Sequence, residues 1–204
     1  MRRYESIINK KIFWINKRIF DYSMCILLLP LLILISFLLL FFNKFFNPGS
    51  LFFFQERMGK NCVSFKAIKY RSMVPAKNIT REYDDPIELD RITSLGKVIR
   101  KFRIDELPQI INVLKGDMSL IGPRPDYYQH ALVFINNIDG YRQRHNIKPG
   151  ITGLAQIRLG YAEGIEATSK KVTFDNYYIK NIGYAIELKI ILYTIFIMFR
   201  GLGK

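Results

Sequence analysis

The sequence predicts an α+β protein attached to a membrane, in which one long apolar helix precedes a β-hairpin and several further helices. Three observations support this prediction. Residues 22–43 contain no charged residue, residues 50–73 carry the signals of two strands around a turn, and later apolar segments have the length of helices. The 204 residues, half of them hydrophobic, are enough for one domain with additional elements.

The formal net charge of +14 indicates an anionic partner, which could be nucleic acid, anionic lipid or a phosphorylated substrate. A nucleic-acid binder should show a recognisable reading motif or aromatic and basic residues interleaved on a sheet, and the sequence shows neither. It also lacks the glycine-rich fingerprints of dinucleotide-binding and P-loop enzymes. Cys25 and Cys62 form no metal-binding spacing and no disulfide framework, as is typical of reduced thiols exposed to the cytosol.

The apolar segment Tyr22–Asn43 has 22 residues and would reach roughly 33 Å as a helix, about the thickness of a bilayer core. A signal peptide would have a shorter apolar region followed by small residues, whereas "FFNKFFNPGS" follows here, so we expect the segment to be retained. Basic residues flank the segment on both sides, so the preference of basic residues for the cytoplasmic side does not indicate how the segment is oriented in the membrane. A crossing helix kinked at Pro30 and a segment that breaks at Pro30 and returns are equally consistent with these residues.

After the membrane segment the sequence predicts a hairpin over residues 50–73 with its turn at 59–61, and a polar loop over Val74–Arg91. The remaining expected elements, in order, are a short basic helix over 94–104, an apolar helix over 107–114 that starts near Pro108 and ends at Gly116, a helix over 130–145, a glycine-punctuated loop over 148–156, and an apolar tail over 184–199. We expect the tail to lie on the membrane surface or to pack against the first segment.

The residues that indicate chemistry begin with Asp105 and Glu106. Acidic residues at a helix start often only cap free N–H groups. Three features favour a catalytic role: the apolar helix that follows, the basic residues within 100–103, and Arg124 between Pro123 and Pro125. Carboxylates that hold a divalent cation or attack phosphorus, together with cations that neutralise phosphate, are what phosphoryl transfer needs. Taken alone, Arg124 could equally be a turn residue in a surface salt bridge.

The ordered set of motifs resembles the bacterial sugar transferase family, the small monotopic phosphoglycosyl transferases that start lipid-linked glycan assembly. The resemblance extends from "KRIFD" at residues 17–21 to "FRG" at 199–201. Six further motifs lie between them in family order: "QERMGK" (55–60), "KYRSM" (69–73), "DELPQ" (105–109), "NVLKGDMSLIGPRP" (112–125), "KPGITGLAQ" (148–156) and "DNYYIKN" (175–181).

The resemblance implies transfer of a sugar 1-phosphate from a nucleoside diphosphate sugar, usually uridine-linked, to polyprenol phosphate with the help of Mg²⁺. This step would initiate synthesis of a capsule, exopolysaccharide, O-antigen or glycoprotein glycan. It implies that Asp105 is the nucleophile and a metal ligand, that Glu106 assists with metal and proton handling, and that Arg124 binds phosphate. Lys69 and Asp175 match two further active-site positions. A non-enzymatic membrane scaffold is the alternative, and it would leave this set of charged residues unexplained.

The resemblance also implies a re-entrant helix–break–helix at the cytoplasmic face of the cell membrane, in contact with membrane lipids. The chain would then divide into residues 1–46, the basic flank and membrane helix, and residues 47–204, the catalytic domain with an amphipathic C-terminal helix. The family usually has a Ser-Pro pair at the break, about one turn later than Pro30. Here Leu29 precedes Pro30, and Ser36 is followed by phenylalanine, so the break is expected to be shifted.

Two regions depart from the family pattern or fall outside its motifs. Leu154 replaces the common tryptophan of the Pro-Gly-Ile-Thr-Gly loop. The loops expected over Val74–Arg91 and Ile157–Lys171 carry no family motif, so the sequence leaves the identity of the sugar open. His130 and His145 do not match catalytic positions, and we expect both to be structural or at the surface.

Overall fold

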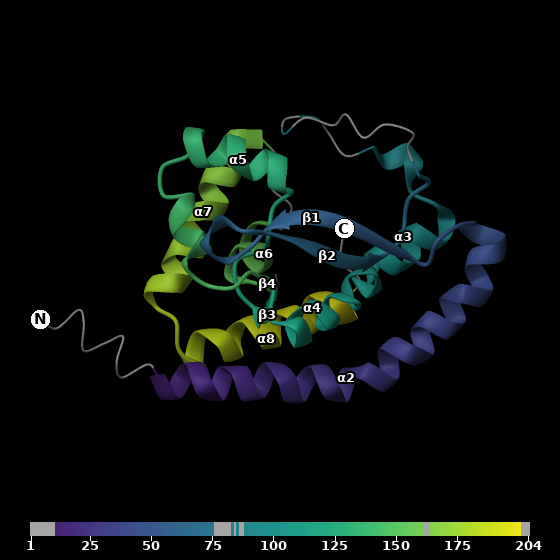
Figure 1. The fold of residues 1–204 in the computed structure, drawn as a ribbon, viewed down its shortest axis with the longest axis horizontal. Helices are drawn as coiled ribbons and strands as arrows, with labels where there is room; N and C mark the ends of the chain where they lie inside the picture. The colour runs from purple at the N-terminus through teal and green to yellow at the C-terminus, as the bar shows by residue number, and fades with distance from the viewer. Residues whose placement is uncertain (1–10, 76–82, 84, 86–87, 161–163, 201–204) are drawn as a thin grey trace, which may run out of the picture.

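The computed structural model describes residues 11–75, 83, 85, 88–160 and 164–200 (Figure 1). It combines helices with two sheets of two strands each, which confirms the α+β class. Most of the loop expected over Val74–Arg91 lies outside the described residues. Short 3-10 helices connect several elements, at Lys60–Cys62, Leu89–Arg91, Ile104–Glu106 and Arg142–Asn146.

The membrane segment is part of one helix, α2 (Lys11–Phe46), which continues through Pro30. The ribbon changes direction near the middle of this helix (Figure 1). A proline inside a helix removes one hydrogen bond and crowds the preceding turn, which is a common cause of such a bend. The interruption expected at Pro30 is therefore a bend within a continuous helix. Among the described helices, α2 is the one long and apolar enough to cross a membrane by length and composition.

The predicted hairpin is confirmed as strands β1 (Phe52–Met58) and β2 (Ser64–Tyr70), which pair antiparallel with Phe53 opposite Lys69. The turn between them contains Asn61 and Cys62, both with positive φ (56° and 62°). Asparagine tolerates this left-handed conformation better than most residues, so the turn forms where the sequence placed it.

Helices α3 (Ser94–Lys101) and α4 (Gln109–Lys115) confirm the two predicted helices around the carboxylate pair. The hydroxyl of Thr93 accepts a hydrogen bond from the backbone N–H of Gly96 at 2.9 Å and caps α3. Gly116 adopts φ 96° and ends α4, as glycine does at many helix C-termini. The carboxylates thus lie in the short connection between two well-capped helices.

The loop expected over residues 148–156 is wrong, because this segment contains strand β4 (Gly150–Thr152) and the start of helix α6 (Leu154–Leu159). Strand β4 pairs parallel with β3 (Ser119–Ile121). A Cβ on Gly150 would lie only 2.1 Å from the backbone nitrogen of Gly122, so the glycines of the motif allow two chain segments to approach closely.

Two helix boundaries also differ from prediction. Helix α5 (Tyr128–Asn137) ends well before residue 145, because Ile138 is extended and Gly140 takes φ 79°. The loop expected over Ile157–Lys171 is wrong at both ends, because residues 157–159 belong to α6 and residues 164–171 belong to helix α7 (Gly164–Lys180).

The predicted apolar tail forms α8 (Tyr184–Phe199), which packs against the first half of α2. The ring of Tyr184 lies edge-on to Phe13 with centroids 5.1 Å apart, and Glu187 forms a 2.7 Å ion pair with Lys17. The tail therefore packs against α2 as one of the two expectations had it, but at residues that precede the apolar segment 22–43; a position on the membrane surface stays a prediction.

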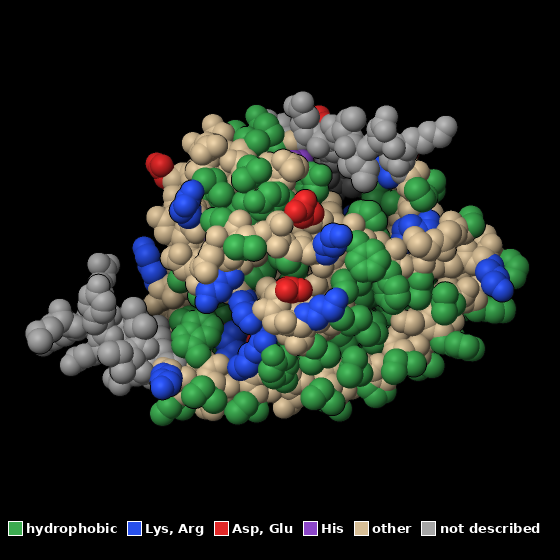
Figure 2. Space-filling view, in the orientation of Figure 1, with side chains coloured by type: hydrophobic (Ala, Val, Ile, Leu, Met, Phe, Trp, Pro, Cys, Tyr) green, Lys and Arg blue, Asp and Glu red, His purple; other side chains and the backbone are tan. Residues whose placement is uncertain are grey.

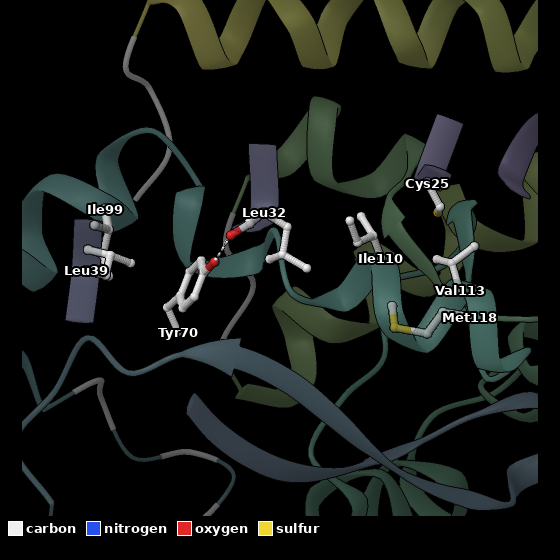
Figure 3. Packing of buried hydrophobic residues seen from close by; sticks show 8 residues of the cluster. All are labelled: Cys25, Leu32, Leu39, Tyr70, Ile99, Ile110, Val113 and Met118. Carbon is white, nitrogen blue, oxygen red and sulfur yellow. Dashed lines mark hydrogen bonds between the residues drawn. The ribbon is translucent and has the colours of Figure 1, made fainter. Parts of the chain in front are cut away.

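The main core joins α2 to the hairpin and to helices α3 and α4. Figure 3 shows Cys25, Leu32 and Leu39 of α2 facing Tyr70, Ile99, Ile110, Val113 and Met118, which come from β2, α3, α4 and the turn after α4. The opposite side of α2 is exposed and apolar: Ile33 and Phe37 keep 68% and 73% of their surface. Figure 2 shows hydrophobic side chains along this outer edge of the molecule. A contiguous apolar surface of this kind is typical of membrane contact.

Candidate active site

The carboxylate pair lies at the entrance to α4. The chain leaves α3, turns at Arg103 with a left-handed φ of 56°, and forms the 3-10 helix Ile104–Glu106 before Pro108 starts the next helix. A non-glycine residue in this conformation is uncommon and often marks a functional turn. Asp105 and Glu106 are both largely buried, at 9% and 6% exposure.

Glu106 is held by two cations from different elements. Lys69 Nζ of β2 lies 3.0 Å from Glu106 Oε1. Arg124, in the loop after β3, donates from Nη1 to Oε2 at 3.0 Å and from Nη2 to Oε1. Burial alone would raise the pKa of the Glu106 carboxyl, but Arg124 and Lys69 outweigh it and hold the pKa well below its ordinary value. Glu106 is therefore ionised at neutral pH.

Asp105 has a different environment although it is adjacent in sequence. Within the described part of the chain its carboxylate has no hydrogen-bonding or ion-pair partner. Burial raises the pKa of the Asp105 carboxyl, and the attraction of the nearby Lys69 offsets only part of this shift. A partly desolvated carboxylate without an internal partner can accept a metal ion or attack an electrophile.

The side chains of this site could hold Mg²⁺ only if a substrate supplied further ligands. The described residues contain no group of three or more His, Cys, Asp or Glu side chains that could hold a metal. Mg²⁺ is often held by one or two carboxylates while substrate phosphates and water fill its other positions. Asp105 would supply the free carboxylate, and the ionised Glu106 would add negative charge beside it.

The Arg124 loop is fixed by two further arginines that the sequence analysis did not single out. Arg144 Nη2 donates to the carbonyl of Arg124 at 2.6 Å, and Arg57 Nη1 donates to the carbonyl of Pro125 at 2.9 Å. Arg57 lies within the "QERMGK" motif, which could have indicated it, whereas Arg144 lies in none of the quoted motifs. Flanking prolines and two donors to backbone carbonyls hold this loop in place.

Asp175 lies apart from the other candidate residues. Its carboxylate is 1% exposed and pairs with Arg144, with Oδ2 2.8 Å from Nη2 and 3.0 Å from Nε. Arg144 also binds Asp126, which in turn pairs with Lys171. The structure thus groups Lys69, Asp105, Glu106 and Arg124, and among the described residues it connects Asp175 to them through Arg144. A direct contact of Asp175 with substrate stays a prediction.

The two histidines lie outside this group. His145 is 4% exposed and contacts the carbonyl of Gly59 through Nδ1 at 3.0 Å, which confirms a structural position. His130 packs its ring edge-on against Tyr127 at 5.0 Å. Leu154, at the position where a tryptophan was expected, is buried in a second apolar cluster around Phe13 and Tyr178.

Comparison with known proteins gives consistent matches. The family described as bacterial sugar transferase matches residues 12–201. The chain is 38% identical over 199 residues to a UDP-N-acetylgalactosamine-undecaprenyl-phosphate N-acetylgalactosaminephosphotransferase of Aeromonas hydrophila, which covers 97% of this chain and 47% of that protein. It is 40% identical over 159 residues to a UDP-glucose:undecaprenyl-phosphate glucose-1-phosphate transferase of Escherichia coli (strain K12), covering 75% of this chain and 33% of that protein.

A shorter relative matches along most of its own length. The exopolysaccharide production protein PSS of Rhizobium leguminosarum bv. phaseoli is 34% identical over 193 residues, which cover 88% of this chain and 92% of that protein. The chain spans less than half the length of the other two relatives.

Proposed function

The chain belongs to the bacterial sugar transferase family, and from this we propose that it transfers a sugar 1-phosphate from a nucleoside diphosphate sugar, namely a UDP-sugar, to polyprenol phosphate. The product would start the assembly of a lipid-linked glycan. The observation that carries the proposal is the contrast within the carboxylate pair. Among the residues that the structure describes, Asp105 has no hydrogen-bonding or ion-pair partner, whereas Glu106 is fixed between Lys69 and Arg124.

The proposed reaction has two displacements at one phosphorus. An Asp105 oxygen attacks the phosphorus that bears the sugar, the bond to the bridging oxygen breaks, and the nucleoside monophosphate leaves with that oxygen and the electron pair. A polyprenol phosphate oxygen then attacks the same phosphorus and displaces the Asp105 carboxylate. Lys69 and Arg124 provide positive charge where phosphate oxygens gain charge in both steps. When bound, Mg²⁺ would neutralise diphosphate charge, with Asp105 and the neighbouring Glu106 as the protein side of its site.

The membrane arrangement is the second part of the proposal, and we place both flanks of α2 on the cytoplasmic face. Contacts with the polar body of the protein occur along nearly the whole helix. Asp21 accepts a hydrogen bond from Ser119 Oγ at 2.7 Å, Ser36 Oγ lies 2.6 Å from the Tyr70 hydroxyl, and Asn47 just beyond the helix donates to the carbonyl of Arg71 at 2.7 Å. A helix that crossed the bilayer would have to give up one end of this series. The contacts therefore support a bent helix that enters the membrane by its outer face and remains monotopic.

The reaction is tested with purified enzyme, polyprenol phosphate and a panel of UDP-sugars. We expect one or a few donors to release UMP, and we expect Asp105→Asn to abolish release while circular dichroism and membrane binding stay normal. Asp139→Asn is the matched control, because Asp139 is an exposed carboxylate on another element. With a labelled donor and no acceptor, the wild type should retain label on the protein. Substantial turnover by a folded Asp105→Asn variant would overturn the assignment of the nucleophile.

Topology is tested by cysteine labelling in intact cells. A cysteine at position 11 and another at position 44, each in a background without Cys25 and Cys62, should both resist an impermeant reagent added outside. Reaction of either one from outside, with the other protected, would show that α2 crosses the membrane.

A further inference from the structure

A cavity of about 380 Å³ lies at the end of α4 opposite the carboxylate pair. Its walls come from the first half of α2, the tip of the hairpin, strand β3 and the segment that leads into β4. The residues that matter for its chemistry are Trp14, Arg18, Lys60, Ser119, Asn146 and Lys148. Figure 2 shows Lys and Arg side chains gathered around a hollow above the first half of α2.

Two of the cations meet at the C-terminal end of α4. A Cβ placed on Gly116 would lie 3.2 Å from Arg18 Nη2 and 3.6 Å from Lys148 Nζ. Asp105 and Glu106 precede the other end of the same helix. The cavity is therefore a site separate from the candidate active site.

The positive charge of this cavity is not balanced from within. Lys17 also lines it but pairs with Glu187, while Asp21 accepts hydrogen bonds from Ser119 Oγ and from the backbone of Leu120. The three remaining cations of the cavity have no ion-pair partner anywhere in the part of the chain that the structure describes; they are Arg18, Lys60 and Lys148.

Both burial and the neighbouring cations act on Lys148. Burial lowers the pKa of its ammonium group, and repulsion from Arg18 and Lys60 lowers it further, while attraction by Asp21 and Asp117 offsets only part of this. In addition, Arg18 Nη1 is buried without a hydrogen-bond acceptor among the described residues, although Nη2 donates to the Tyr22 hydroxyl. A buried donor of a charged group that lacks an acceptor is costly, and an anion from outside would relieve both the repulsion and the unmet donor.

The residues around the cavity indicate the source of the anion that would bind in it. Ile12, Ile15 and Ile19 on the same half of α2 are exposed (70%, 51% and 59%), and Trp14 at the cavity keeps 37% of its surface. Tryptophan is enriched where apolar membrane core meets headgroups. The cavity thus opens beside the apolar surface that we place in the membrane.

We propose that this cavity binds the anionic phosphate headgroup of a membrane lipid, with Arg18, Lys60 and Lys148 as the phosphate-binding side chains. The proposal rests on the membrane contact of α2 but not on the transfer reaction. Its consequence is that one lipid headgroup anchors the first half of α2 to the membrane at a fixed depth, away from the reacting groups.

Trp14 is the single tryptophan of the chain, so its fluorescence reports directly on the cavity. We would titrate the detergent-solubilised full chain with phosphatidic acid, phosphatidylglycerol, phosphatidylcholine and inorganic phosphate. The expected result is a saturable change with the two anionic lipids and little change with phosphatidylcholine or inorganic phosphate. Equal responses to anionic lipid and phosphatidylcholine would overturn the proposal. Saturation by inorganic phosphate at the same affinity would overturn the lipid source in favour of a soluble phosphate compound.

Variants test the named side chains. Arg18→Gln/Lys148→Gln should weaken the apparent affinity for phosphatidic acid about tenfold or more, because two charged donors are lost. Lys66→Gln/Lys180→Gln is the matched control, with the same change in net charge at two exposed lysines outside the cavity. Lys60→Gln is the second cavity variant, in case the double variant does not fold, because Lys60 lies at the exposed tip of the hairpin. It should weaken the binding of phosphatidic acid several-fold. Equal losses in the cavity and control variants would show non-specific attraction and refute the site.

The variant Asp105→Asn distinguishes failure of the lipid site from failure of the proposed transfer reaction. It should lose transfer but bind phosphatidic acid like the wild type, since Asp105 lies at the other end of α4. A parallel loss of lipid binding in this variant would refute the separation of the two sites.

Discussion

Arg144 is predicted to stabilise the fold and, independently, to position Arg124. The proposed change is Arg144→Met, which keeps most of the side-chain volume and removes the guanidinium. Arg144 is 1% exposed and pairs with Asp126 and Asp175, and its Nη2 reaches the carbonyl of Arg124. The control is Arg142→Met, because Arg142 is exposed on the same 3-10 helix.

The size of the loss in stability depends on which partners Asp126 and Asp175 keep when Arg144 is replaced. Asp126 retains Lys171 and the hydroxyl of Tyr141, which donates to it at 2.7 Å, so it stays compensated. Asp175, at 1% exposure, loses its direct partner. Breaking a buried ion pair costs about 3–5 kcal/mol, and we expect the lower end because burial already raises the pKa of Asp175, which can take up a proton. A loss of about 3 kcal/mol should lower the melting temperature by about 6–12 °C in a chain of this size.

A second substitution distinguishes the two roles. Arg144→Met/Asp175→Asn removes the uncompensated charge and should regain about 2 kcal/mol of the lost stability. It does not restore the donor to the Arg124 carbonyl. We therefore expect the double variant to unfold almost like the wild type yet to keep a turnover at least about tenfold lower than that of Asp175→Asn alone, because misplacing a charge-stabilising group weakens it at the transition state.

The assay is thermal and urea unfolding in one detergent, together with UMP release per folded molecule at saturating substrates. The reasoning fails if the double variant regains turnover along with stability, since Arg144 would then act only through the fold. It also fails if Arg144→Met costs no more than Arg142→Met.

Three further predictions concern neighbouring parts of the fold. Arg124→Lys keeps the charge but loses the two-pronged contact with Glu106, so turnover should fall about 30- to 1,000-fold and Arg124→Ala should lose more; near-normal turnover with a lowered melting temperature would make Arg124 structural. Burial lowers the pKa of His145 to about 4, below its ordinary 6.5, so the folded state binds fewer protons than the unfolded chain between these values. Stability should therefore drop by about 3 kcal/mol as the pH falls from 6.5 to 4, and unfolding of His145→Gln should lack this component. Gly122→Ala would place a Cβ 2.7 Å from the carbonyl oxygen of Lys148, so urea unfolding should show a loss of about 2 kcal/mol or more, and an unchanged midpoint would refute the close approach.

The sequence predicted those parts of the fold that depend on residues close to one another in the chain. The hairpin follows from aromatic and β-branched residues around a turn that Asn61 can adopt, and α4 follows from an apolar run that Gly116 ends. The grouping of Asp105, Glu106, Lys69 and Arg124 was predictable from the ordered motifs. The contacts within the group were not predictable. Arg124 pairs with Glu106, which lies 18 positions earlier in the chain and in a different element.

Helix α7 was missed for a physical reason. It buries Thr168, Lys171 and Asp175 against the rest of the protein, where a periodicity analysis expects apolar residues. Lys171 and Asp175 can be buried because Asp126 and Arg144 compensate them, and these partners lie about 30 to 45 positions earlier in the chain. A pattern that depends on distant partners cannot be read from a local window. Strands β3 and β4 were missed because three residues each are too few to show alternation.

Strand β2 links the proposed chemistry to the membrane helix through two consecutive residues. Successive side chains of a strand point to opposite faces, so Lys69 reaches Glu106 while Tyr70 packs against α2 and donates to the carbonyl of Leu32 at 3.1 Å (Figure 3). The hydroxyl of Tyr70 also meets Ser36, beyond the bend that follows Pro30. The height of Lys69 above α2 is thereby fixed by the register of one strand against one helix. In the proposed reaction a soluble donor and a membrane-bound acceptor react at the same phosphorus, and this register places the Lys69–Glu106 pair directly above the helix that we place in the membrane.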